Sequence, residues 1–171
     1  MSVSQAFERI YNGKIGTQNV TCDPVDPLAK AFEMEHYLGT WYQIMHVREA
    51  PFLAESWMCG QIIYSTMDNK GSFMEHTVGQ KESFGAHFSS HGEMYCPKRL
   101  PSGQCYVRYE NDEWLKHTVV DTDYTNYAVT YRCLPQHGSY LTVMARSPEL
   151  DEEFLENIMF TVMYKLPNFN F

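Results

Sequence analysis

Short apolar and aromatic runs alternate with turn-forming residues along the chain from residue 40 onward. Runs of this length, bounded by Gly, Pro, Asn and Asp, are typical of strands joined by hairpins. Two clear breaks between runs are Asp68-Asn69-Lys70-Gly71 and Asn111-Asp112. The pattern predicts eight strands, at residues 40–49, 57–67, 72–82, 84–96, 104–110, 114–122, 126–134 and 138–146.

A helical pattern follows these runs near the C-terminus. Ser147, Pro148 and Glu149 offer an N-cap, a proline at the first helical position and an acidic first turn. Apolar residues then recur at the spacing of one helical face: Leu150, Phe154, Leu155, Ile158 and Met159. We expect a helix over about residues 148–160 and a short strand from Phe160 to Tyr164.

Eight sequential strands and one late helix predict an all-β fold, an eight-stranded antiparallel up-and-down barrel with the helix packed outside. The chain has 171 residues, about the length of one domain. Asp23-Pro24 and Asp26-Pro27 interrupt the first forty residues, and a short helical turn is expected from Leu28 to Met34. We therefore divide the chain into an irregular N-terminal arm, residues 1–36, and a barrel domain, residues 37–171.

The charge pattern narrows the range of partners. The formal net charge is −8, and the 13 Lys and Arg residues are scattered singly. Nucleic-acid binding requires a basic stripe, so no nucleic-acid partner is expected. No apolar run approaches the ~20 residues of a membrane-spanning helix. The N-terminus shows no signal peptide, whereas five cysteines favour secretion or another extracytoplasmic space, so the compartment stays open.

Three separated segments resemble one protein family. They are residues 37–44, with Gly39-Thr40-Trp41 at their centre, residues 120–128, with Thr122-Asp123-Tyr124, and Arg146 at the end of the last strand. Their order and spacing are similar to the three signatures of the lipocalins. Cys22, Cys59 and Cys133 fall where the apolipoprotein D-like branch has cysteines. The resemblance implies a calyx, in which Trp41 plugs the closed end and Arg146 lies across its indole ring.

Alternation along each strand then selects the residues that line the barrel. Counting back from Arg146 gives Met144, Thr142 and Tyr140, and counting forward from Trp41 gives Gln43 and Met45. His117 and Val119 share a face, which alignment with retinol-binding relatives places on the inner wall. The predicted ligand-binding residues are Gln43, Met45, His117, Val119, Tyr140, Thr142 and Met144.

The resemblance favours binding or transport of a small hydrophobic ligand of the fatty acid, retinoid, steroid or bilin type. The only expected cofactor is such a bound lipid or chromophore. The alternative is a non-catalytic lipocalin-fold subunit of a larger assembly, docked on a protein partner through the N-terminal arm. No enzyme is expected, because no Ser/His/Asp grouping, phosphate loop or zinc spacing is present. No metal site is expected either, since His87 and His91 on one strand lie about 13 Å apart.

The cysteines predict two disulfides. Cys96 and Cys105 flank a short loop between adjacent strands, which brings them within disulfide range. The family resemblance implies a second bridge, Cys22–Cys133, which holds the N-terminal segment against the barrel. Cys59 is expected to remain a free thiol.

Overall fold

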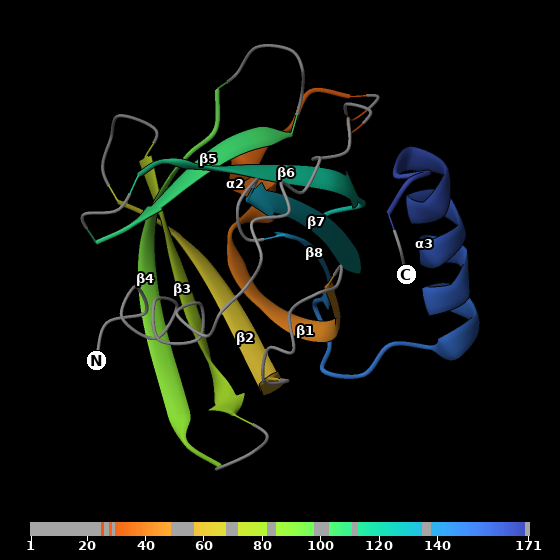
Figure 1. The fold of residues 1–171 in the computed structure, drawn as a ribbon, viewed down its shortest axis with the longest axis horizontal. Helices are drawn as coiled ribbons and strands as arrows, with labels where there is room; N and C mark the ends of the chain where they lie inside the picture. The colour runs from red at the N-terminus through yellow and green to blue at the C-terminus, as the bar shows by residue number, and fades with distance from the viewer. Residues whose placement is uncertain are drawn as a thin grey trace.

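The computed structural model describes residues 25, 28, 30–48, 57–67, 72–81, 85–97, 103–110, 113–134 and 138–169. Eight strands form one closed barrel in sequence order (Figure 1). They are β1 (Gly39–Arg48), β2 (Trp57–Thr66), β3 (Ser72–Lys81), β4 (His87–Tyr95), β5 (Gln104–Tyr109), β6 (Leu115–Thr122), β7 (Tyr127–Leu134) and β8 (Gly138–Ala145). Every neighbouring pair is antiparallel, and β8 returns to pair with β1. The predicted up-and-down barrel is confirmed.

Alternation along the strands separates two apolar clusters, one inside the barrel and one outside it. Val119 belongs to the interior cluster and the adjacent Val120 to the exterior one. The exterior cluster joins the outer faces of β6, β7 and β8 to α3 (Glu152–Lys165), which lies beside the barrel in Figure 1. Both faces of this wall are therefore buried, which explains the nearly continuous burial of β8.

The C-terminal helix begins later and ends later than the sequence pattern predicts. Its N-cap is Asp151, whose side chain accepts a hydrogen bond from the Phe154 amide at 3.1 Å. The predicted start near residue 148 is therefore wrong, and so is the strand from Phe160 to Tyr164. Val162 follows Ile158 at helical spacing and both pack on the barrel wall. This packing outweighs the β propensity of Thr161 and Val162.

A second, short helix, α2 (Met34–Tyr37), directly precedes β1 (Figure 1). It replaces the helical turn predicted from Leu28 to Met34, where Lys30 to Glu33 are not helical. Met34 and Tyr37 are both buried against the interior cluster. Their burial explains why the helix forms here, because so short a helix depends on tertiary packing.

Disulfide bonds reinforce the barrel. Cys96 and Cys105 are bonded, with 4.2 Å between their Cα atoms, as predicted from the hairpin. Cys133 is also disulfide-bonded, and its partner lies outside the described residues. Cys22 and the side chain of Cys59 fall in the same undescribed part, so the pairing of Cys22 with Cys133 stays a prediction. Neither helix of the described chain has the length and apolar character needed to cross a membrane.

Candidate ligand-binding site in the barrel

Arg146 and Trp41 close one end of the barrel. The Arg146 guanidinium lies 3.6 Å from the centre of the indole ring. It also donates hydrogen bonds to the carbonyl oxygens of Thr40, Tyr124 and His36. The indole Nε1 donates to the Tyr37 carbonyl at 2.8 Å. The predicted cation–π contact is confirmed, and these two residues have a structural role.

The closed half of the barrel is filled by side chains. Tyr37 packs against both Trp41 and Tyr64, with ring centres 5.1 and 5.0 Å apart. Val119 and Met144, two of the predicted lining residues, belong to this packed cluster and are 0% exposed. A ligand therefore has no space beside them in this arrangement, and the candidate site lies beyond them, toward the other end.

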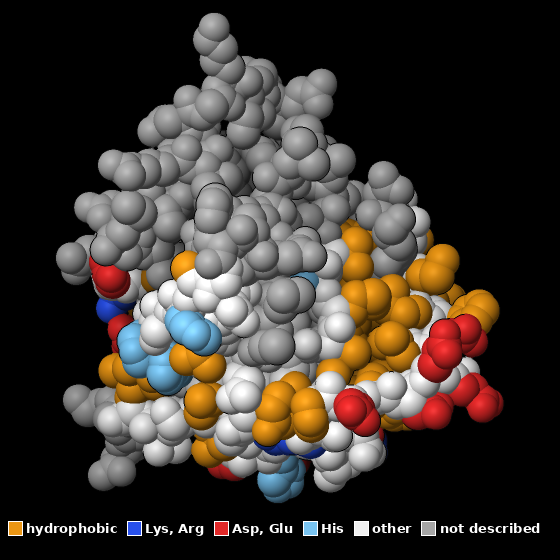
Figure 2. All heavy atoms as spheres, turned by 90° about the horizontal axis from the view of Figure 1, so that it is seen from below, with side chains coloured by type: hydrophobic (Ala, Val, Ile, Leu, Met, Phe, Trp, Pro, Cys, Tyr) orange, Lys and Arg blue, Asp and Glu red, His pale blue; other side chains and the backbone are white. Residues whose placement is uncertain are grey.

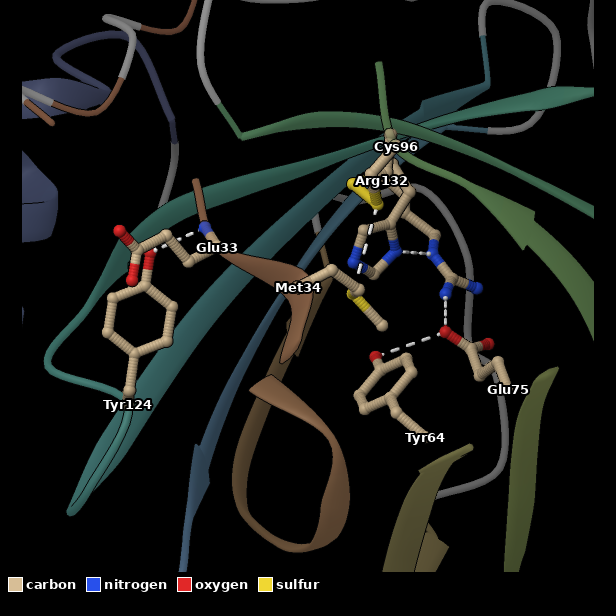
Figure 3. Close-up of a disulfide and its surroundings, with 9 residues drawn as sticks. Glu33, Met34, Tyr64, Glu75, Cys96, Tyr124 and Arg132 are labelled. Carbon is tan, nitrogen blue, oxygen red and sulfur yellow. Dashed lines mark hydrogen bonds and ion pairs between the residues drawn. A yellow bond between two sulfur atoms is a disulfide. The ribbon is translucent and has the colours of Figure 1, made fainter. Parts of the chain in front are cut away.

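A buried ion pair lies next to this packed cluster, toward the other end of the barrel. Glu75 on β3 and Arg132 on β7 reach each other across the interior, with 2.5 Å between Oε2 and Nη2 (Figure 3). The side chain of Glu75 is 1% exposed and that of Arg132 is 10% exposed. Burying two charges is unfavourable unless they are paired and hydrogen-bonded, so their partners decide how the site behaves.

Tyrosines complete the hydrogen bonding of this pair. The Tyr64 hydroxyl donates to Glu75 Oε2 at 3.1 Å, and the Tyr109 hydroxyl donates to Glu75 Oε1. Arg132 Nη1 donates to the hydroxyls of Tyr109 at 2.5 Å and Tyr140 at 3.4 Å. Together with His117, these residues form what we term the polar cluster: Tyr64, Glu75, Tyr109, His117, Arg132 and Tyr140.

A glycine makes room for Tyr109. Gly92 lies opposite it on β4, and a Cβ added there would come within 2.8 Å of the Tyr109 ring. The ring therefore rests against the backbone of β4, and its hydroxyl reaches both members of the ion pair. Any larger residue at position 92 would displace the tyrosine from the polar cluster.

The polar cluster carries no net charge at neutral pH. Burial alone would raise the pKa of Glu75, but the Arg132 guanidinium and the hydrogen bonds to the carboxylate lower it to about 2. Burial, reinforced by the charge of Arg132, lowers the pKa of His117 to about 3. The pKa of Arg132 is raised well above its ordinary value, mainly because Glu75 offsets the effect of burial. One anion, one cation and a neutral imidazole therefore remain.

The hydrogen bonds also fix the tautomer of His117. Arg132 Nε donates to His117 Nδ1 at 2.7 Å, so Nδ1 must be the unprotonated nitrogen. The ring proton of the neutral imidazole then sits on Nε2. This atom is buried and finds no acceptor among the described residues. His117 is 1% exposed, so it is buried in the barrel interior together with the ion pair.

Five predicted lining residues lie on β1 and β8, and all of them except Met45 face the interior. Gln43 lies inside, where it would contact a side chain placed at Gly60 on β2 at 3.2 Å. Thr142 Oγ1 is 2.9 Å from His46 Nδ1, and the Tyr140 ring lies 5.3 Å from that imidazole. Tyr140 and His46 remain partly exposed.

Met45 lies on the other face of β1. The pairing of β1 with β8 shifts between Gln43 and Met45, so one extra residue enters the strand there. Met45 consequently packs against the exterior cluster beneath α3. The prediction that Met45 lines the interior is wrong, and His46 takes that place.

Sequence reasoning missed Glu75, Arg132 and Tyr109. A signal for two of them was present, because each charged residue lies in phase with interior residues of its own strand. Glu75 is two residues from the buried Phe73, and Arg132 is two residues from the buried Thr130. A charge at an interior position needs a partner, and only the folded barrel reveals which one.

The outer wall of the barrel carries a stacked pair of histidines. His76 and His91, on β3 and β4, stack with ring centres 4.1 Å apart, and His76 Nε2 lies 2.9 Å from Ser89 Oγ. Figure 2 shows histidines gathered on this side of the molecule. Among the residues that the structure describes, no group of three or more His, Cys, Asp or Glu could hold a metal ion.

Comparison with known proteins identifies the family. Residues 38–162 match the model of the lipocalin / cytosolic fatty-acid binding protein family. The chain belongs to this family. It is 27% identical to apolipoprotein D of Rattus norvegicus in an alignment of 141 residues that covers 76% of this chain and 69% of the relative.

Solved structures with a similar fold include insecticyanin from the tobacco hornworm Manduca sexta. The TM-score is 0.67 at 21% identity, over 85% of this chain and 81% of that one. The tryptamine complex of the amine binding protein of Rhodnius prolixus also has a TM-score of 0.67, at 18% identity, over 85% of this chain and 83% of that one. Both likenesses concern the fold.

Proposed function

We propose that the protein binds and carries a small hydrophobic ligand in the half of the barrel beyond the polar cluster. The observation that carries this proposal is the division of the interior into a packed apolar end and a hydrogen-bonded polar layer. Ligand sites of this kind are mostly apolar and contain a few placed polar groups that fix orientation. Tyr109, Tyr140 and His46 are partly exposed, so their polar atoms are candidates for that role.

The proposed lining combines part of the predicted set with newly found residues. Gln43, Tyr140 and Thr142 remain from the sequence prediction, and His46 and Phe88 join them. Phe88 covers Gly79 on β3, where an added Cβ would lie 2.6 Å from its ring. His117, Val119 and Met144 support the floor of the proposed site from below.

We propose a binding role without catalysis. The titratable groups of the polar cluster satisfy one another: Glu75 holds its carboxylate in three hydrogen bonds and Arg132 pairs with it. Cys105, the buried cysteine of the interior cluster, is in a disulfide and is no nucleophile. The disulfides at Cys96, Cys105 and Cys133 support maturation in an oxidising, extracytoplasmic space.

The experiment is a titration with all-trans retinol, followed by quenching of tryptophan emission. Saturable quenching at one ligand per chain and roughly micromolar affinity is expected. Thr142→Phe should abolish it by filling the proposed site. Thr125→Phe is the matched control, since Thr125 is exposed in the turn before β7. Absence of saturable binding to the unmodified protein, or equal binding to both variants, would contradict the proposal.

A second candidate function is that of a non-catalytic subunit in a larger assembly. Three apolar side chains of α3 face solvent: Phe160 is 74% exposed, Met163 52% and Tyr164 82%. Apolar and acidic side chains share the side of the molecule where α3 lies (Figure 2). Light scattering of the purified protein tests this candidate for self-assembly, because docking of one copy on another through these side chains would raise the mass above that of one chain.

A further inference from the structure

Hydrogen-bond donors of the polar cluster remain unused beside its buried ion pair. Arg132 has five N–H groups, of which four are used, on His117, Tyr109, Tyr140 and Glu75. One N–H of its Nη2 therefore remains. The Tyr140 hydroxyl accepts from Arg132 and donates to no group in the described part of the chain.

The carboxylate acceptor of the cluster is largely occupied. Glu75 Oε1 accepts from Tyr109, and Oε2 accepts from both Tyr64 and Arg132. An ionised carboxylate has about four lone-pair sites, so three of them are engaged. The carboxylate is also 1% exposed, which leaves no face open to a ligand. A ligand ammonium group would therefore find no open carboxylate to pair with, only neutral hydroxyl oxygens.

The charge balance of the cluster opposes an anionic ligand as well. Glu75 already neutralises Arg132 at a distance of 2.5 Å. A second carboxylate beside Arg132 would leave one uncompensated negative charge in a buried layer, close to Glu75. Burial of an unpaired charge is strongly unfavourable. The unused hydrogen-bond donors of this neutral cluster therefore suit an uncharged oxygen acceptor on the ligand.

From these contacts we infer that the carried ligand ends in an uncharged oxygen acceptor, a carbonyl above all, which receives hydrogen bonds from Tyr140 and Arg132. This inference rests on the proposed function, because it names the chemical class that the site selects. It favours apolar ketones, aldehydes and esters over fatty-acid anions and over amines. Tyr140 is the specificity residue, since its side chain is only partly buried and its hydroxyl proton has no acceptor among the described residues.

A chain-matched ligand series tests this inference. The neutral fluorescent probe N-phenyl-1-naphthylamine is bound first and then displaced at pH 7 by dodecane, 2-dodecanone, dodecanoate or dodecylammonium. The ketone should compete about tenfold more strongly than the hydrocarbon, because one or two net hydrogen bonds raise the affinity by about this factor. The anion and the cation should compete at least tenfold more weakly than the ketone.

Tyr140→Phe should reduce the preference for ketone over hydrocarbon to about twofold, with the affinity of the probe for this variant measured first and used to convert each displacement into a ligand affinity. Tyr106→Phe is the matched control, because Tyr106 is 37% exposed on the barrel's outer face. If the probe does not bind, the proposed function fails. If the probe binds and dodecanoate or dodecylammonium competes best, or if Tyr140→Phe keeps the full ketone preference, the carrier role stands and this inference is overturned.

Discussion

At the scale of single residues, the barrel interior is organised by Arg132. Its guanidinium neutralises Glu75, fixes the tautomer of His117 and orients Tyr109 and Tyr140. Such a network stabilises the fold only while its members keep the protonation states that fit together. The neutral state of His117 is essential, because a proton on Nδ1 would remove the acceptor that Arg132 Nε requires.

The dependence of stability on pH follows from His117. The unfolded chain binds a proton at this imidazole below about pH 6.5, whereas the folded protein keeps it neutral down to about pH 3. Because the unfolded state binds more protons in this range, the free energy of unfolding falls as the pH falls from 6.5 toward 3. Urea denaturation at pH 7 and pH 5 measures this fall in the free energy of unfolding. Both pH values lie above the ordinary pKa of a glutamate, so that the titration of Glu75 stays outside the measured range.

His117→Gln should reduce this dependence between pH 7 and pH 5, because glutamine does not titrate. His87→Gln, at an exposed position on β4, is the control and should retain the dependence of the unmodified protein. Equal slopes for all three proteins would show that His117 does not titrate differently on folding.

At the scale of elements, periodicity predicted the strands well because each has one face toward the interior. It could not predict the extra residue after Gln43 in β1, which moves Met45 outside and His46 inside. A bulge leaves the composition of a strand unchanged and shows only in its pairing with the neighbour. The helix end was missed for a related reason: the burial of Val162 depends on the outer wall of the barrel.

The extent of α3 can be tested through two neighbouring residues. In the helix Val162 is 0% exposed and Phe160 is 74% exposed, whereas a strand would direct both side chains to the same face. Val162→Ala should lower the free energy of unfolding by about 1–3 kcal/mol, for lost burial and the cavity left behind. Phe160→Ala should change it by less than about 0.5 kcal/mol. Similar losses in both variants would contradict the helix.

At the scale of the whole molecule, covalent bonds support a barrel whose interior contains an ion pair as well as apolar side chains. Family resemblance predicted the fold and the closed end, since Trp41 and Arg146 stand at matching positions. It could not predict the polar cluster, because Glu75, Tyr109 and Arg132 come from separate strands. Only barrel closure brings them together. Cys133 lies next to Arg132 on β7, so its disulfide fixes the strand that supplies the guanidinium.

The disulfide that contains Cys133 is therefore expected to affect both the stability of the barrel and its ligand site. We predict that a non-reducing peptide map will recover Cys22 linked to Cys133, Cys96 linked to Cys105, and Cys59 as a free thiol.

The first bridge, Cys22–Cys133, would close a loop of roughly a hundred residues and stabilise the fold by about 4–5 kcal/mol in the chain-entropy model. Cys133→Ser should then lower the free energy of unfolding more than Cys96→Ser combined with Cys105→Ser, whose shorter loop contributes about 2–3 kcal/mol. A peptide that links Cys59 to Cys133 would contradict the pairing.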